Sequence, residues 1–374
     1  MEDIIFIIFC LLSIINIKIK GLNDFYYDYM NLENTSSIKG IFVWMIIFSH
    51  IKSYYNKRYK YKYKYMRIIR YFGQKMVSLF LFYSGYGINE SIKKKGIIYV
   101  KTLPKKGMIL FIKFQLILFI FFLNNLILGI KINIKTYFLS MIFKSNIGNS
   151  NWFAFTIINL YFFSYISFTF IKNKKYIIIG LFINNIICFI YIYFVFNYFY
   201  QKKTYSVDNI LCFLMGQYYS LLKNSLDKIL MKNDIFYFGN TSIFILIYYY
   251  FYNKKRKNLL LISLTNTIFS LIIIIISMKI KFKNEFLNLL NSHSFSIYLL
   301  QRVVMKFIFH KKYFQNYEFI RFFFIFITIL FISNLFDNYT GFINKIFDRK
   351  KNENKYNLIK NIKGFNEEKI NISN

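Results

Sequence analysis

A lysine and a histidine flank a short apolar stretch near the start of the chain, Lys39 to His50 (KGIFVWMIIFSH). Eleven steps of about 100° make roughly three turns, so in a helix both side chains lie on one face. At about 1.5 Å per residue they stand about 16 Å apart along the axis, roughly half the hydrocarbon thickness of a bilayer. Ionisable groups within membrane helices are costly and mark functional sites, so this pair is the first candidate for chemistry.

An imidazole exchanges protons near neutral pH, which suits a general base, whereas a lysine ammonium can bind an anionic substrate. The chain has three histidines: His50, His293 and His310. For His50, a hydrogen bond to a neighbouring helix is the structural alternative to proton transfer, and periodicity leaves both roles open. We expect His293 to cap a helix or to bond within a loop. His310 precedes Lys311 and Lys312, which indicates the membrane interface.

Composition places this pair in a membrane protein. The chain has 374 residues, 56% hydrophobic and 22% aromatic, with a single proline, whereas soluble domains average about 45–50% apolar. The net charge of +34 accompanies an excess of Lys, Ile, Asn, Tyr and Phe, which indicates a compositional bias. The basic residues lie in short loops, so we assign them to lipid headgroups and anionic ligands and expect no nucleic acid. Cys10, Cys188 and Cys212 lie in apolar runs, and no metal site is expected.

The apolar runs predict an all-α fold, a polytopic membrane bundle of about ten core transmembrane helices. Candidate N-caps at Asn34 to Ser37 precede the first of them. The run at residues 4–17 leaves open an extra N-terminal helix. We divide the chain into an N-terminal segment (1–35), a membrane domain (36–344) and a short polar tail (345–374). The ten helices are expected at residues 39–50, 76–91, 108–130, 151–171, 176–200, 208–222, 235–252, 259–279, 286–309 and 318–340.

Five short motifs, in order, resemble the signature of the acyltransferase 3 family, the integral-membrane acyltransferases of bacterial surface carbohydrates. The first is the basic residue, ten intervening residues and histidine of Lys39 and His50, where the family usually has arginine at the basic position. The family's S-x-x-I-Y-L pattern is often followed by a histidine, where this chain has Gln301. The resemblance spans roughly residues 39–340. The other four motifs are LFLFYSGYG (79–87), Trp152-Phe153, Phe213-Leu214-Met215-Gly216 and Ser294-Phe295-Ser296-Ile297-Tyr298-Leu299.

The resemblance implies transfer of an acyl group, with acetyl expected, from cytoplasmic acyl-CoA to a hydroxyl of a cell-surface carbohydrate or its lipid-linked precursor. It implies His50 as the general base, with a direct acyl-histidine intermediate as the variant. The expected partners are acyl-CoA as donor substrate, a carbohydrate acceptor and membrane lipid, with no permanently bound cofactor and a multi-pass location in the cell membrane.

The resemblance also assigns further residues to the site. Binding of the donor phosphates falls to Lys39, Lys101, Lys105 and Lys106, and the substrate cavity to Ser84, Tyr86, Trp152 and Tyr298. Lysine keeps the charge of the family's arginines but lacks their bidentate fork. The structural alternatives are an ordinary basic cytoplasmic loop for the lysines, helix packing for Ser84 and Tyr86, and interfacial anchoring for Trp152 and Tyr298.

A second function stays open from the sequence: a polysaccharide or lipid transporter or polymerase with a structural intramembrane histidine. The two functions differ in what a mutant would lose. Substitution of His50 would remove acyl groups from the glycan in the first case, and would reduce export or chain length in the second.

Overall fold

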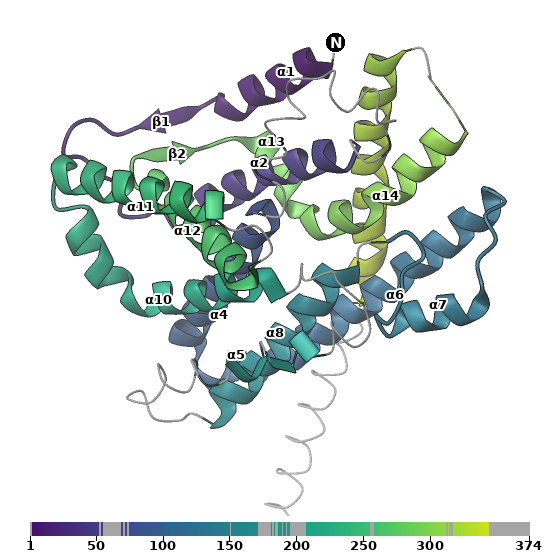
Figure 1. The fold of residues 1–374 in the computed structure, drawn as a ribbon, viewed down its shortest axis with the longest axis horizontal. Helices are drawn as coiled ribbons and strands as arrows, with labels where there is room; N and C mark the ends of the chain where they lie inside the picture. Colours follow the sequence, from purple (N-terminus) through teal and green to yellow (C-terminus); the bar gives the residue numbers. More distant parts are fainter. Residues whose placement is uncertain are drawn as a thin grey trace, which may run out of the picture.

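A computed structural model shows a helical bundle with one small pair of strands (Figure 1). It describes residues 2–51, 75–149, 151–170, 207–254, 258–311 and 317–343, with single residues or short pieces at 54, 69, 72, 313 and between 181 and 194. The all-α fold class is confirmed, whereas the predicted number of ten core helices is not established. The helix expected at 176–200 and the polar tail fall almost wholly outside the described residues.

The helix α2, Leu32–Ile51, is the central element of the bundle. Its side chains are buried almost without interruption from Asn34 to Phe48, because neighbours cover it on nearly every side. The helix α1, Glu2–Ile14, packs along it through T-shaped contacts of Phe6 and Phe9 with Phe48. Figure 1 shows α1 in purple along the upper edge and α2 in dark blue below it, across the middle of the molecule.

The helix α2 begins earlier than the candidate caps Asn34 to Ser37 indicate, so their assignment as N-caps is wrong. The Asn31 side chain accepts the backbone N–H of Asn34 at 2.8 Å, which caps the first turn. Asn34 itself is fully buried and joins two other segments. It donates to the Tyr29 carbonyl at 2.8 Å and accepts the N–H of Phe282 at 2.9 Å.

The described part of the N-terminal segment is bonded to the core at several points. The strand β1, Ile17–Ile19, pairs antiparallel with β2, Ile280–Phe282, with Lys18 opposite Lys281. The Asn284 amide donates to the Leu12 carbonyl at 2.6 Å, and Trp44 Nε1 donates to Ser13 Oγ at 3.0 Å.

The remaining helices surround α2. A short connection after α4 leads into α6, where Pro104 occupies the first turn and costs no hydrogen bond. The bounds are α4 Lys75–Lys95, α5 Ile97–Val100, α6 Leu103–Ile127, α7 Ile134–Met141, α8 Asn151–Phe170, the 3₁₀ turn η3 Val207–Asn209, α10 Ile210–Leu230, α11 Asp234–Lys254 and α12 Leu259–Ser277.

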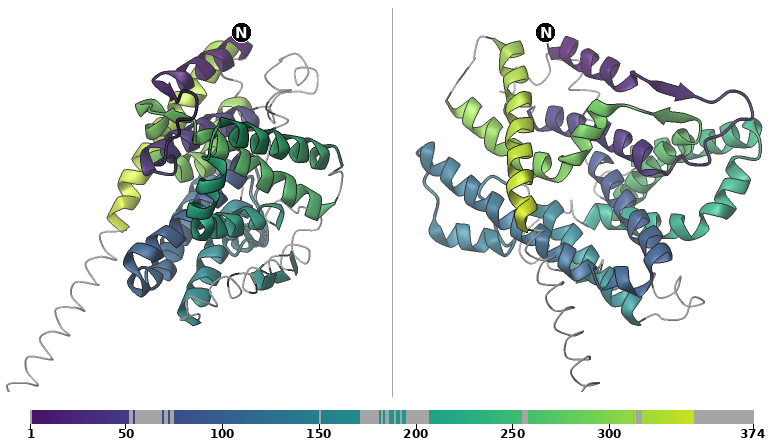
Figure 2. Two further views of the ribbon diagram at one scale, coloured as in Figure 1. Left: turned by 90° about the vertical axis from the view of Figure 1, so that its left-hand side faces the viewer. Right: turned by 180° about the vertical axis from the view of Figure 1, so that it is seen from behind.

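The helix expected at 286–309 is two helices in the structure, α13 Glu285–Ser292 and α14 Ser294–His310. His293 separates them with φ −105° and ψ 13°. The last helix, Glu318–Ile343, runs beside α14 and α6 and is drawn in yellow-green in Figures 1 and 2. The break falls in the four consecutive polar residues Asn291 to Ser294, and His293 is the residue between the two helices, in keeping with the expectation that it caps a helix.

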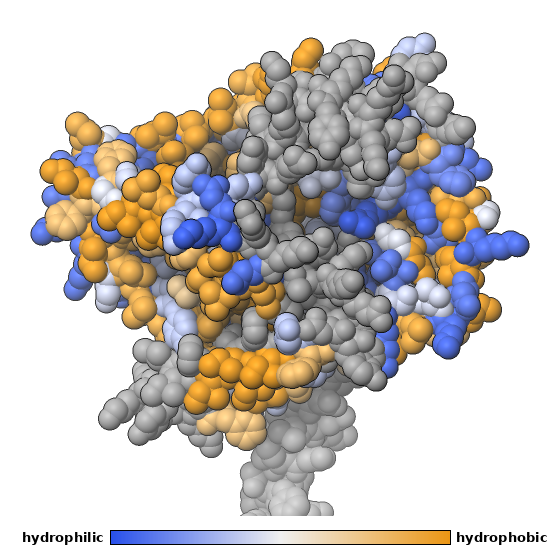
Figure 3. Space-filling view, viewed as in Figure 1, coloured by the Kyte–Doolittle hydropathy of each residue, from blue (hydrophilic) through white to orange (hydrophobic). Residues whose placement is uncertain are grey.

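Four segments of the described chain are long and apolar enough to cross a membrane: Ile97–Ile127, Asn151–Phe170, Leu259–Ser277 and Glu318–Ile343. Apolar side chains also cover much of the face shown in Figure 3, including its left-hand side. The helix α1 has 13 residues, about 20 Å at 1.5 Å per residue, which is shorter than a bilayer core of about 30 Å.

Two glycines bring α4 and α10 into direct backbone contact. A Cβ at Gly85 would lie 2.1 Å from the Phe213 carbonyl oxygen, and one at Gly216 would lie 2.1 Å from the Phe82 carbonyl oxygen. Both glycines belong to motifs noted in the sequence. Small residues of this kind let helices approach closely and gain dispersion energy.

Replacement of Gly216 by alanine is expected to destabilise the protein by about 1–3 kcal/mol, because the new methyl group meets rigid backbone. The thermal unfolding midpoint of the detergent-solubilised protein measures this loss. Gly239→Ala is the matched control, since no atom lies within 4 Å of a Cβ there. Equal midpoints for the two variants would contradict the close packing of α4 on α10.

Candidate active site

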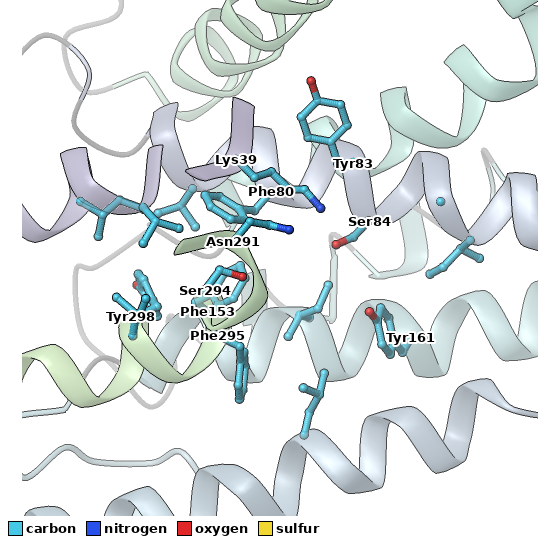
Figure 4. A pocket seen from close by; sticks show the side chains of 18 of the residues that line it. Lys39, Phe80, Tyr83, Ser84, Phe153, Tyr161, Asn291, Ser294, Phe295 and Tyr298 are labelled. Carbon is cyan, nitrogen blue, oxygen red and sulfur yellow. The ribbon is translucent and has the colours of Figure 1, made fainter. Parts of the chain in front are cut away.

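An elongated pocket of about 420 Å³ lies between α2, α4, α8 and the α13–α14 turn (Figure 4). Its volume is within the range of about 300–1,000 Å³ that is usual for small-molecule sites. The wall is mainly apolar and carries a few polar groups. It is formed by Lys39, Val43, Ile46, Val77, Phe80, Tyr83, Ser84, Gly87, Ile88, Ser91, Tyr99, Leu110, Phe153, Ile157, Tyr161, Asn291, Ser294, Phe295, Ile297 and Tyr298.

One face of α4 lines the pocket along its length. Val77, Phe80, Ser84, Gly87 and Ser91 recur every three or four residues, which places them on one side of a helix. Fourteen steps at about 1.5 Å give this face a length of about 21 Å. The pocket is therefore long and narrow, which suits an extended chain better than a compact ligand.

Lys39 projects from α2 into the pocket. In Figure 4 its ammonium points into the space in front of Ser84, and the Asn291 amide lies beside it. Lys39 Nζ lies 6.0 Å from the centre of the Tyr83 ring. Within the described part of the chain, no carboxylate lies within ion-pair distance of Lys39. An enclosed cation without a counter-ion is costly, so the pocket is suited to an anionic or strongly polar ligand.

His50 lies one helical turn beyond Ile46 on the same side of α2, past the end of the pocket wall. Its ring centre is 6.1 Å from that of Tyr298, and Tyr298 is 5.1 Å from Phe153. Since Ile46, Tyr298 and Phe153 line the pocket, His50 adjoins its end. Lys39 therefore lines the pocket, and His50 lies next to one of its lining residues, Tyr298.

Gln301 lies beside His50, which the sequence alone could not show. Its side chain is fully buried and donates from Nε2 to the Tyr298 carbonyl at 3.0 Å. Its Oε1 is buried and has no hydrogen-bond partner among the described residues, so it is available to accept an imidazole N–H and fix which ring nitrogen accepts a proton. The only sequence signal was that this position departs from the family pattern.

The other predicted lysines differ in their placement. Lys106 donates to the Tyr99 hydroxyl at 2.9 Å and lies 4.1 Å from that ring, and Tyr99 lines the pocket. Lys105 is half-buried and Lys101 exposed, and neither lines the pocket. The structure therefore brings Lys106 to the end of the pocket that is remote from His50.

Two of the four residues predicted for the cavity line the pocket, and two do not. Ser84 and Tyr298 line the pocket. Tyr86 instead faces Tyr219, with ring centres 6.3 Å apart, and Trp152 lies outside the wall while its neighbour Phe153 lines it. The sequence analysis missed Asn291 and Tyr99, because the chain brings them to the pocket from segments without a recognisable motif.

Asp337 on the last helix holds the α13–α14 turn in place. It accepts Ser296 Oγ at 2.6 Å, His293 Nδ1 at 2.8 Å and Lys113 Nζ of α6 at 3.0 Å. These groups are mostly buried, with 16% of the Lys113 side chain and 20% of the Asp337 side chain exposed. Ser294 and Tyr298 leave the same turn on the pocket side, so the Asp337 contacts fix that wall from behind.

Comparison with known proteins identifies the family of the chain. The acyltransferase 3 family model, described as an acyltransferase domain, matches residues 36–337. The chain belongs to this family. No curated protein and no solved structure matches it. Together with the four apolar helices, membership makes the chain a membrane acyltransferase.

Asp337→Ala is expected to destabilise this acyltransferase by about 1–3 kcal/mol, because it leaves three mostly buried donors without their acceptor. A lower thermal midpoint of the purified protein measures the effect. Asp24→Asn is the control, since the Lys20–Asp24 pair is 3.9 Å apart with 68% of the Asp24 side chain exposed, and exposed pairs contribute about 0–1 kcal/mol. A larger loss in the control would contradict the assignment.

Proposed function

We propose that this membrane protein transfers an acyl group, with acetyl expected, from acyl-CoA to a hydroxyl of a cell-surface carbohydrate or its lipid-linked precursor. The main support for this proposal is the pocket, which begins near Lys106, contains the Lys39 ammonium and ends beside His50. Acyl-CoA has phosphates at one end and a thioester at the end of a long arm. The distribution of charge along the pocket supports such a donor.

In this proposal the donor lies along the α4 face. Lys39 and Lys106 attract its anionic and carbonyl groups, and the thioester reaches the end of the pocket at Tyr298. The narrow apolar wall orients the arm and limits the access of water, which would otherwise hydrolyse the thioester. Ser84 and Asn291 supply hydrogen-bonding groups partway along the pocket.

At the end of the pocket, His50 accepts the proton of the acceptor hydroxyl as its oxygen attacks the thioester carbonyl. The new carbon–oxygen ester bond forms, the carbon–sulfur bond breaks, and the proton passes from the imidazole to the departing coenzyme A thiolate. In the variant mechanism the imidazole attacks first and carries the acyl group to the hydroxyl. Gln301, beside the ring, orients the imidazole in both routes.

His50→Ala is expected to lower acyl transfer by about 10²–10⁴-fold, the usual contribution of a general base. The measurement is the transfer of label from [¹⁴C]acetyl-CoA to glycan in membranes that contain the variant. His310→Ala is the control, because its side chain is exposed at the end of α14. Unchanged transfer by a well-folded His50 variant would refute the assignment, and a change in export or glycan length alone would favour a transporter or polymerase.

Lys39→Gln is expected to weaken acetyl-CoA binding by about 10–100-fold, since a hydrogen bond to a charged group contributes about 1.5–3 kcal/mol. The KM for acetyl-CoA and its stabilisation of the purified protein against heat both report this change. Lys39→Arg keeps the charge and should retain most of the affinity. Lys135→Gln, at an exposed position on α7, is the control, and an equal loss there would assign donor binding to general surface charge.

A further inference from the structure

The helix α14 carries a row of cations that continues beyond the pocket. Ser294 and Tyr298 line the pocket, and Arg302 and Lys306 follow at the same four-residue spacing, so each residue is turned by about 40° from the one before it and Arg302 lies close in direction to Tyr298. Each four-residue step adds about 6 Å along the axis. The row therefore passes His50, which lies beside Tyr298, and extends to the side remote from Lys39.

Arg302 and Lys306 are partly enclosed. Arg302 is close enough to His50 to interact with it electrostatically, and its Nε is buried without a hydrogen-bond partner. Lys306 is half-buried and donates to Asn125 Oδ1, an uncharged acceptor. Among the described residues, no carboxylate lies within ion-pair distance of Arg302 or Lys306.

Other partly buried lysines of this chain do meet a carboxylate. Lys113 pairs with Asp337 at 3.0 Å, and Lys279 pairs with Asp234 at 2.5 Å with 9% of its side chain exposed. Enclosing a cation without a counter-ion costs several kcal/mol in desolvation. Arg302 and Lys306 share with Lys39 the lack of a carboxylate within ion-pair distance among the described residues, and they lie on the side of His50 opposite Lys39.

We propose that Arg302 and Lys306 bind an oxyanion of the acceptor, a phosphate or carboxylate carried by the glycan or by its lipid carrier. This inference rests on the proposed function, because it places the acceptor on the side of His50 opposite the donor. A planar guanidinium binds an oxyanion through two parallel hydrogen bonds, which fixes orientation as well as position. Anchoring the acidic group would select the hydroxyl that reaches the imidazole.

The test measures heat stability of the purified full chain in phosphatidylcholine nanodiscs, first with saturating coenzyme A and then with added inorganic pyrophosphate. Coenzyme A occupies the donor lysines, so a further rise in the unfolding midpoint reports a second anion site. Arg302→Gln and Lys306→Gln are expected to weaken the pyrophosphate effect about tenfold or more and to retain the coenzyme A effect. Arg302→Lys should retain part of the pyrophosphate effect. Lys311→Gln, at an exposed neighbour, is the control.

Each outcome has a defined meaning. A pyrophosphate effect that is absent in the wild type, or equal in Arg302→Gln, overturns the acceptor site. Failure of coenzyme A to stabilise the wild type contradicts the proposed function instead. Titration with a polyprenyl phosphate and with glucuronic acid separates a lipid-carrier phosphate from a glycan carboxylate. Stabilisation by phosphatidylglycerol in the nanodisc that needs Arg302 would assign the site to bulk lipid and overturn the proposal.

Discussion

The enclosure of the Lys39 ammonium without a carboxylate is the constraint on which the site depends. The helix α2 is buried almost throughout, so this cation must be met by its own surroundings or by a ligand. Asn291 and Ser84 supply polar groups, and the pocket supplies space. An apolar side chain filling that space would leave the charge desolvated at a cost of several kcal/mol. The position of Lys39 therefore accounts both for the positive charge of the site and for the open space beside it.

Close backbone contacts between helices hold Lys39 and the pocket walls in place. A Cβ at Gly40, next to Lys39, would lie 2.1 Å from the Leu287 carbonyl oxygen of α13, so α2 and α13 touch directly at the site. The Gly85–Phe213 and Gly216–Phe82 contacts fix α4 on α10 in the same way. Asp337 then fastens the turn after α13 through three donors. Contacts of this kind hold the reacting groups at a fixed distance and orientation. Such positioning contributes a large part of the rate enhancement in transfer reactions.

The sequence predicted much of the fold because membrane helices carry a strong local signal. Apolar runs and their basic boundaries gave bounds within a few residues for α4, α8, α11 and α12. The sequence-based prediction was wrong where contacts between distant residues accompany a helix end. At the break, His293 binds Asp337, 44 residues later, and in the early first turn of α2 the buried Asn34 bonds to Tyr29 and Phe282. No apolar pattern records either contact.

The sequence by itself determined the helical membrane class, the family, and the pairing of Lys39 with His50 on one face of α2, because helix periodicity and composition are local properties. Only the tertiary structure decided that Ser84 and Tyr298 line the pocket and that Tyr86 and Trp152 do not. It also placed Gln301 and Arg302 beside His50. Which side of a membrane helix faces a cavity depends on its neighbours, and an all-round apolar helix carries no sequence signal for that choice.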